Sequence, residues 1–213
     1  MTTVNAITPR RVTAEETLIQ QEEKAIDRIK KARAILGDEV VFLGHHYQRD
    51  AVIQFADFQG DSYQLGKEGA KVKAKYIVFA GVHFMAESAA ILGREDQVVV
   101  LSNMKAGCTM ADMASLEQVL TAWIELEEAL KDDPEAHIVP ITYVNSFASL
   151  KAFVGERGGA VCTSSNARGV LEWAFSQREK VFFFPDQHLG RNTGRRWASH
   201  WSRWLGGTRS SLT

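Results

Sequence analysis

Three things are scarce in this chain of 213 residues: cysteine, an excess of charge of one sign, and long apolar stretches. Only two cysteines are present, Cys108 and Cys162, and no CxxC or Cys/His spacing surrounds them. Their number and placement argue against a disulfide scaffold and against a self-contained zinc site. We expect both thiols to be reduced or to act as ligands.

The charges nearly cancel, because 25 lysines and arginines stand against 26 aspartates and glutamates. This balance gives no general attraction to nucleic acid or to an anionic membrane. No stretch reaches the roughly 20 apolar residues of a membrane-spanning helix, and the polar start MTTVNAITPRR is unlike a secretory signal. The sequence therefore predicts small-molecule partners, no nucleic acid, no membrane and a cytoplasmic location.

The chain alternates between helical and strand-like segments. Residues 15–36 and 116–134 carry apolar side chains at helical spacing. Five short runs rich in Val, Ile and Phe lie at 40–44, 76–82, 97–103, 136–145 and 180–186. Continuous apolar strands separated by helices predict a layered α/β fold with a parallel sheet covered on both faces. No GxGxxG or GxxxxGK[ST] string follows any of the runs, which argues against a nucleotide-binding domain.

Each apolar run stops in a polar cluster, and ligands of parallel sheets bind beyond the carboxyl ends of the strands. The clusters are His45-His46-Tyr47, Val82-His83, Ser102-Asn103, Tyr143-Val144-Asn145 and Asp186-Gln187-His188. Any one of them is more simply explained as turn and cap residues that meet water. Five in succession favour a binding site.

Two of these clusters begin a repeated pattern. His45-x-Tyr47 is followed 17 residues later by Ser62 at a helix start, and Tyr143-x-Asn145 is followed 21 residues later by Ser164. The pattern predicts two similar units with a site between them, and chance similarity is the rival explanation. A serine at a helix start either caps backbone N–H groups or offers its hydroxyl to an anion.

The residue types in this pattern suit a small dicarboxylate. Tyr143 and Asn145 offer neutral hydrogen bonds, and His45 is a donor that can be charged near neutral pH. His46 should point to the opposite face of its strand, which leaves His45 and Tyr47 on the face that looks into the site.

Cys108 lies in the loop SNMKAGCTMADM, directly after the run at 97–103. Among Ala, Gly and Met, a cysteine is most simply a small hydrophobic residue. A cysteine backed by glycine at a strand end is also a place from which a metal-cluster ligand could project. Spacing alone leaves both readings open.

Seven strings in one order closely resemble quinolinate synthase of bacterial NAD biosynthesis. They are HHYQ, GDSYQL, VHFMAESA, SNMKAGCTMADM, ITYVNSFASLKA, CTSSNARGVLEWAF and FFPDQHLGRNTG. The resemblance implies condensation of iminosuccinate, which L-aspartate oxidase supplies, with dihydroxyacetone phosphate to give quinolinate, phosphate and water. It also implies repeated three-layer α/β/α domains with short parallel sheets, three in the family in pseudo-threefold arrangement and about two here.

The resemblance further implies a 4Fe-4S cluster held by three cysteines, one per domain, whose open iron position acts as a Lewis acid. Cys108 matches the first of these ligands, whereas Cys162 matches none. The residues that match the family's iminosuccinate-binding positions are His45, Ser62, Tyr143, Val144, Asn145 and Ser164. Tyr47 matches a tyrosine implicated in proton transfer, so Tyr47 and His45 are the predicted catalytic residues.

The departures from the family are as informative as the matches. Family members continue into a third domain with two more cluster cysteines, a His-Pro-Glu segment and a substrate-binding threonine, none of which is present here. With Cys108 alone, the chain is expected to be an incomplete and inactive form of the enzyme. The alternative is a non-catalytic α/β module that binds a small dicarboxylate or phosphate ligand.

Four segments are therefore expected along the chain. They are a helical lead-in at 1–38, a first α/β domain at 39–114, a second at 115–194 and an aberrant tail at 195–213. The tail places Trp197, Trp201 and Trp204 among arginines, as an amphipathic helix that binds a partner or a membrane would. Because the possible codons of this tail permit the peptide expected in the family, we favour a frameshift near residue 194.

Overall fold

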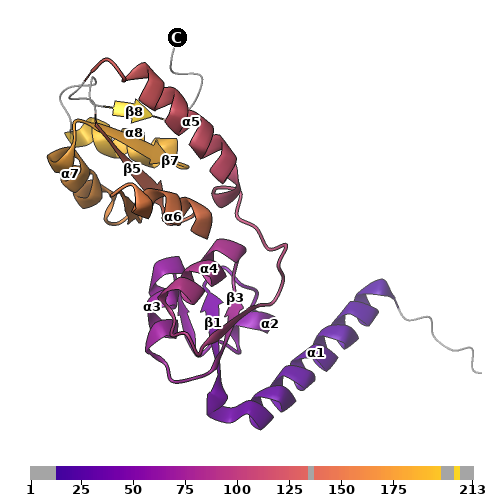
Figure 1. Cartoon of the computed structure of the whole chain (residues 1–213). Helices are drawn as coiled ribbons and strands as arrows, with labels where there is room; N and C mark the ends of the chain where they lie inside the picture. The colour runs from indigo at the N-terminus through magenta and orange to yellow at the C-terminus, as the bar shows by residue number, and fades with distance from the viewer. Residues whose placement is uncertain (1–12, 134–136, 198–203, 207–213) are drawn as a thin grey trace, which may run out of the picture.

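The computed structural model of the chain describes residues 13–133, 137–197 and 204–206. The chain forms two α/β units joined by one connecting segment, and a long helix projects from the first unit (Figure 1). Each unit is built on a four-stranded sheet in which all strands are parallel. The predicted α/β class is confirmed. Among the described residues, none of the helices combines the length and the apolar character needed to cross a membrane.

The first unit has the sheet order β2-β1-β3-β4. Its elements are η1 (Gly37–Glu39), β1 (Val40–His45), α2 (Asp50–Ile53), β2 (Phe58–Gly60), α3 (Ser62–Lys71), β3 (Tyr76–Ala80), α4 (His83–Leu92), β4 (Val98–Leu101) and η2 (Ala111–Met113). The three apolar runs predicted in this part of the chain form β1, β3 and β4. The short strand β2 was not predicted, because FQG carries a single large apolar residue.

The second unit has the sheet order β6-β5-β7-β8, which repeats that of the first. Its elements are α5 (Leu116–Ala129), β5 (Ile138–Tyr143), α6 (Ala148–Glu156), β6 (Ala160–Cys162), α7 (Ala167–Gln177), β7 (Lys180–Phe184), α8 (Gln187–Trp197) and β8 (Trp204–Gly206). The boundary expected at residue 194 falls inside α8, and β8 pairs with β7. Residues 198–203 and 207–213 of the expected tail lie outside the described part of the chain.

The strand register confirms the predicted repeat. The last aligned pairs are His45 with Gly60 in the first sheet and Tyr143 with Cys162 in the second. Ser62 and Ser164 each follow two residues after the second member of the pair, so they occupy equivalent places. The spacing is longer in the second unit chiefly because α6 has 9 residues where α2 has 4.

The second sheet is covered on both faces because alternate residues of β7 enter different cores. Val181 and Phe183 pack with residues of α7, whereas Phe182 and Phe184 pack with residues of α5 and α6. This is the three-layer arrangement expected for such a sheet.

The first sheet is fully covered on one face only. Ile77 and Phe79 of β3 pack against α3 and α4 in a single core. On the opposite face, Val98 and Val100 of β4 stay 46% and 43% exposed.

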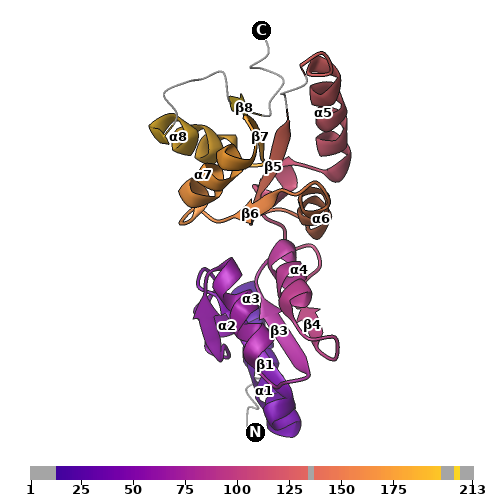
Figure 2. The same cartoon turned by 60° about the vertical axis from the view of Figure 1, so that its left-hand side comes forward.

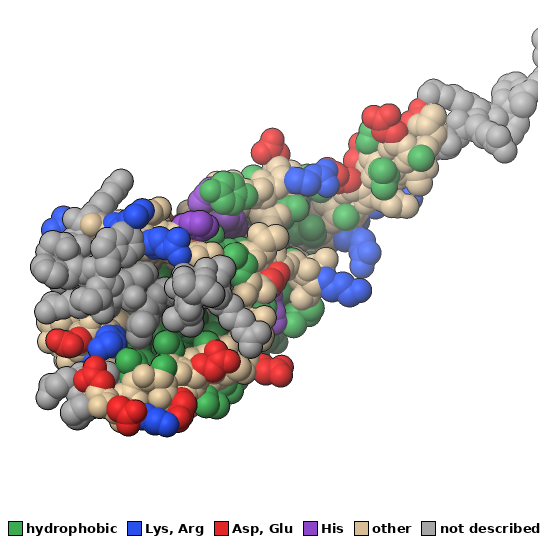
Figure 3. Space-filling model, turned by 90° about the horizontal axis from the view of Figure 1, so that it is seen from above, with side chains coloured by type: hydrophobic (Ala, Val, Ile, Leu, Met, Phe, Trp, Pro, Cys, Tyr) green, Lys and Arg blue, Asp and Glu red, His purple; other side chains and the backbone are tan. Residues whose placement is uncertain are grey.

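Helix α1 (Ala14–Leu36) extends away from the first unit, and Figure 3 shows apolar side chains exposed along it among charged ones. It begins at a capping box in which Thr13 and Glu16 each accept a hydrogen bond from the other's backbone N–H. Its far end is fixed by Arg33, whose guanidinium lies 2.6 Å from a carboxylate oxygen of Asp57. No residue of α1 is buried.

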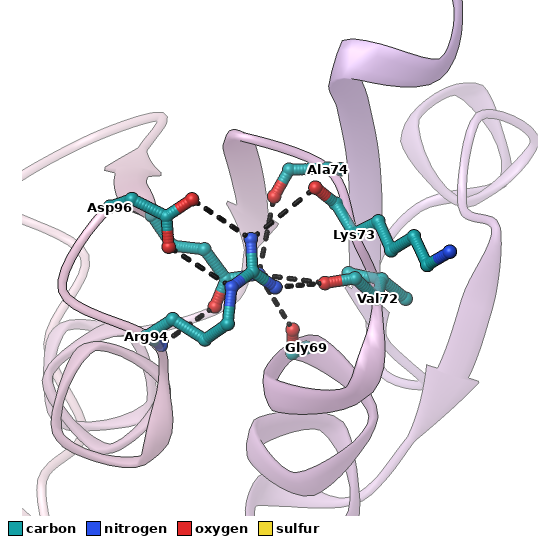
Figure 4. A network of polar contacts seen from close by, with 7 residues as sticks. Gly69, Val72, Lys73, Ala74, Arg94 and Asp96 are labelled. Atoms are coloured by element: carbon teal, nitrogen blue, oxygen red, sulfur yellow. Dashed lines mark hydrogen bonds and ion pairs between the residues drawn. The ribbon is translucent and has the colours of Figure 1, made fainter.

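A polar network on the turn before β4 fixes the C-terminal end of α3 (Figure 4). Arg94 forms two hydrogen bonds with the Asp96 carboxylate, which lower the pKa of Asp96. Arg94 and Gln97 also donate to the carbonyl oxygens of Gly69, Val72, Lys73 and Ala74. Helix C-terminal carbonyls lack intrahelical donors, so the network satisfies them and fixes the helix that starts at Ser62.

Candidate functional site

A cavity of about 330 Å³ lies between the two units. On one side is α3, and on the other are the end of β5 and the loop between β6 and α7, which face the first unit in Figure 2. Five of the eight predicted site residues line it: Ser62, Tyr143, Val144, Asn145 and Ser164. The size is in the range of small-molecule sites.

Ser62 is the first residue of α3 but does not cap it. The cap is Asp61, whose Oδ1 accepts a hydrogen bond of 2.9 Å from the backbone N–H of Gln64. The simpler explanation of this serine as a helix cap therefore does not apply, and its side chain lines the cavity instead.

Ser164 lies in the turn before α7 and hydrogen-bonds the side chain of Tyr143. Burial raises the pKa of Tyr143, and this hydrogen bond opposes the rise without cancelling it. The phenol consequently stays protonated at neutral pH and can donate a hydrogen bond to a ligand.

Asn145 connects the cavity to Cys108 of the first unit. The Asn145 Nδ2 group lies 3.7 Å from Cys108 Sγ, within hydrogen-bonding range of sulfur. Cys108 is half-buried, whereas Cys162 is fully buried in the core between the second sheet and α7, where burial raises its pKa to about 12. Of the two thiols, Cys108 alone is placed to act as a ligand.

The described residues do not by themselves fit a four-iron cluster. They contain no group of three or more His, Cys, Asp or Glu side chains arranged to hold a metal ion. Such a cluster is bound by several thiolates, and the cavity region offers only that of Cys108.

The histidine pair and Tyr47 form a compact group of rings outside the cavity lining. The ring centroid of His45 lies 4.5 Å from that of His46 and 4.7 Å from that of Tyr47. The prediction that His46 points to the opposite face is wrong, because β1 ends at His45 and the chain turns there, with Gln48 N donating to His45 O. His46 Nδ1 lies 3.0 Å from the Gly60 carbonyl oxygen, and Tyr47 is 83% exposed.

The environment of His45 differs from the one predicted. Burial and the neighbouring His46 lower its pKa, and the charge of Asp61 opposes them. The imidazole is therefore neutral at neutral pH rather than a cationic donor. Asp61 links this ring group to the cavity, since it both interacts with His45 and lines the cavity wall.

Two lysines of the cavity wall were not predicted. Lys67 and Lys71 line it from α3, and Lys71 pairs with Glu68 at 2.9 Å. Tyr63, Lys67 and Lys71 recur every fourth residue, which places them on one face of the helix. The signal in the sequence is the four-residue spacing counted from Tyr63, the residue after Ser62.

Comparisons with known proteins show that the chain is similar to quinolinate synthases. The family model described as "Quinolinate synthetase A protein" matches residues 24–207. The quinolinate synthase of Acidobacterium capsulatum is 59% identical over 167 residues, which cover 78% of this chain and 44% of that protein. That of Corynebacterium glutamicum is 52% identical over 193 residues, which cover 88% of this chain and 48% of that protein.

This chain spans under half the length of the curated relatives it matches. Its match to the Herpetosiphon aurantiacus quinolinate synthase, for example, covers 45% of that protein. The family match continues past residue 194, where we favour a shift of reading frame, up to residue 207. The frameshift stays a prediction, and resequencing the gene from the codon for Asp186 onward checks it.

Proposed function

This chain belongs to the quinolinate synthetase A protein family, and from that premise we propose that it carries part of a quinolinate synthase. The reaction condenses iminosuccinate with dihydroxyacetone phosphate and releases phosphate and water. The chain supplies the wall of the site that holds the four-carbon dicarboxylate. The observation that supports this role is one cavity lined both by Ser62 of the first unit and by Tyr143, Asn145 and Ser164 of the second.

The donor types suit a dianion that must be held without being neutralised. The two serine hydroxyls, the Asn145 amide and the protonated Tyr143 phenol are neutral donors at neutral pH. Of the two lysines on the α3 side of the cavity, Lys71 is paired with Glu68, so Lys67 is the cation placed to contact a carboxylate of the ligand.

Tyr47 and His45 are proposed to handle protons. A neutral His45 accepts a proton at its free ring nitrogen, and the Tyr47 ring lies against it with its side chain open to solvent. Cys108 is proposed as one thiolate ligand of the family's 4Fe-4S cluster, which acts as a Lewis acid when bound. The residues of this chain carry binding and proton transfer. A cytoplasmic location and supply of iminosuccinate by L-aspartate oxidase belong to the same proposal.

A second candidate is a non-catalytic module that binds a dicarboxylate. Two observations favour it. Residues of both units line the cavity, as a binding site between them requires, and the described residues provide only one accessible thiol for a cluster. Such a module would bind its ligand without iron.

Calorimetric titration of the iron-free chain with L-malate, a stable four-carbon dicarboxylate, separates the two. Ser62→Ala and Ser164→Ala should each weaken binding about tenfold, because each removes a hydrogen bond to a charged group. Ser176→Ala is the control, since Ser176 bonds a carbonyl of its own helix on α7.

Micromolar, serine-dependent binding would support the module, and millimolar, serine-dependent binding would support the incomplete enzyme. Absence of binding, or equal affinity in the pocket variants and the control, would contradict both.

A further inference from the structure

Helix α6 of the second unit is capped by a side chain of the first. Glu87 on α4 accepts, through Oε2, a hydrogen bond of 2.9 Å from the backbone N–H of Ala148. Ala148 is the first residue of α6, and the preceding residue, Phe147, makes no side-chain cap bond. The first N–H groups of a helix have no intrahelical acceptor, so Glu87 supplies one from 61 residues away in sequence.

Lys151 reinforces the same contact one helical turn further along α6. Its Nζ donates to the carbonyl oxygen of Ser146 and lies 5.6 Å from the ring centroid of Phe84 on α4. Burial lowers the pKa of Lys151 to about 8, although the Glu87 carboxylate acts in the opposite direction. The ammonium group thus sits between a carboxylate, a carbonyl and an aromatic face of two different units.

The contact fixes a short loop that carries site residues. The loop between β5 and α6 contains Val144 and Asn145, and its last residue, Phe147, packs its ring edge-on against His83 of α4 at 5.8 Å. Asn145 in turn reaches Cys108. The start of α4 is joined to the loop that carries Cys108, because His83 N donates to Ala106 O. A shift of α6 relative to α4 therefore changes the distance between Asn145 and Cys108.

We propose that Glu87, assisted by Lys151, is a positioning residue that fixes the β5–α6 loop against the first unit and thereby holds Asn145 at Cys108. Neither residue lines the cavity, so each acts through the loop. The value of the contact for catalysis rests on the proposed function, but the contact itself can be tested without substrate.

Alkylation of the reduced, iron-free chain by iodoacetamide at pH 7 provides the test, with the two cysteines followed separately by mass spectrometry. Glu87→Ala removes the acceptor and should speed labelling of Cys108 about fivefold, the ratio that corresponds to the loss of one helix cap. Glu87→Gln keeps an acceptor of the same length and should restore a rate near that of the parent chain. Glu95→Ala changes an exposed carboxylate of the first unit and should have no effect.

Cys162 serves as the internal control, because it is fully buried and reacts only if the core between the second sheet and α7 opens. If Cys108 labels equally fast in the parent and Glu87→Ala chains while Cys162 stays protected, the proposal is wrong. Equal acceleration by the Gln and Ala variants also overturns it, since charge rather than position would then control the thiol. If Glu87→Ala also exposes Cys162 to alkylation, the Glu87→Asp variant, whose shorter side chain cannot reach the Ala148 amide, replaces it. The labelling rate of Cys108 in that variant is then compared with that of the parent chain.

Hydrogen exchange at the Ala148 amide is the second measurement, and it addresses the bond directly. Exchange should be faster in Glu87→Ala and near parental in Glu87→Gln. If these results hold but L-malate affinity does not change with them, the contact stands and the proposed role of the cavity fails. If the amide exchanges equally in all variants, the contact itself fails.

Discussion

The two α/β units share strand order and register but differ in how their sheets are covered. In the second unit, α5 precedes the first strand of the sheet and packs Trp123 against Phe153 and Phe182. In the first unit, α1 holds the same place in chain order, yet none of its residues is buried, and Val100 is 43% exposed. Topology alone therefore does not decide whether a sheet becomes a three-layer sandwich, because the preceding helix must also dock.

The units differ again at the equivalent ends of their central strands. Tyr143 and Asn145 line the cavity, whereas His45 and Tyr47 form a ring group outside its lining. The same backbone position thus carries neutral donors in one unit and a titratable imidazole in the other. The proposed function accordingly gives ligand binding to Tyr143 and Asn145 and proton transfer to His45 and Tyr47.

The largest expected effect tests whether the two cores are independent. Phe79 and Phe183 hold equivalent positions in β3 and β7 and are almost fully buried in separate cores. Truncating either to Ala should lower the free energy of unfolding of its own unit by about 3–5 kcal/mol. Differential scanning calorimetry should then show that each variant shifts one transition only. A single transition that moves equally in both variants would mean that the units unfold together.

The contact between the units predicts a pH dependence. The pKa of Lys151 is about 8 in the folded chain and 10.5 in the unfolded one, so between these values the unfolded state binds more protons. The free energy of unfolding should therefore rise with pH across this window, by about 2 kcal/mol once residual solvent access is allowed for. Lys151→Met should lack the rise in urea titrations at pH 7.5 and 10. Parallel pH slopes in the two chains would argue against a buried ammonium.

Because the first sheet has an open face and both faces of the second are covered, the same valine truncation should lower the free energy of unfolding by different amounts. Val139 of β5, on the α7 face of the second sheet, is 4% exposed, whereas Val100 of β4, on the open face of the first sheet, is 43% exposed. Val139→Ala should cost about 2 kcal/mol of unfolding free energy, whereas Val100→Ala should cost about 0.5 kcal/mol. Chemical denaturation of the matched pair measures this. Similar costs would indicate that the open face of the first sheet is covered in solution.

The smallest expected effect concerns glycines in helices of the two units. A Cβ added at Gly169 of α7 meets nothing within 4 Å, whereas one at Gly66 of α3 meets Leu92 of α4 at 3.2 Å. Gly169→Ala should raise stability by about 0.5–1 kcal/mol through helix propensity, and Gly66→Ala should give no gain. Thermal unfolding monitored by circular dichroism compares them. A gain at both positions would show that α3 and α4 are less closely packed than described.

The sequence predicted much of the fold because the strands carry continuous apolar runs. All five runs became strands, and the weak repeat of His45 and Ser62 with Tyr143 and Ser164 matched the register. The strands β2, β6 and β8 were missed because three residues carry too little periodicity to be recognised, and Trp204 of β8 was expected in an amphipathic helix.

The site was predictable where strand ends converge and not where the chain turns or where units meet. Strand alternation failed at His46, because the strand had already ended. The pairing of Glu87 with Ala148 leaves no local signal, since it joins residues far apart in sequence. Contacts of this kind depend on how whole units dock, which no short pattern encodes.

The cap that α4 provides to α6 also has a consequence for the order of folding. During synthesis the first unit leaves the ribosome before α6 does, so the Glu87 carboxylate is already in place when the Ala148 amide emerges. The first unit can then serve as a template on which the second begins its helix. When the whole chain refolds from denaturant, no preformed first unit is available, because α4 with Glu87 and α6 with Ala148 must become ordered at the same time.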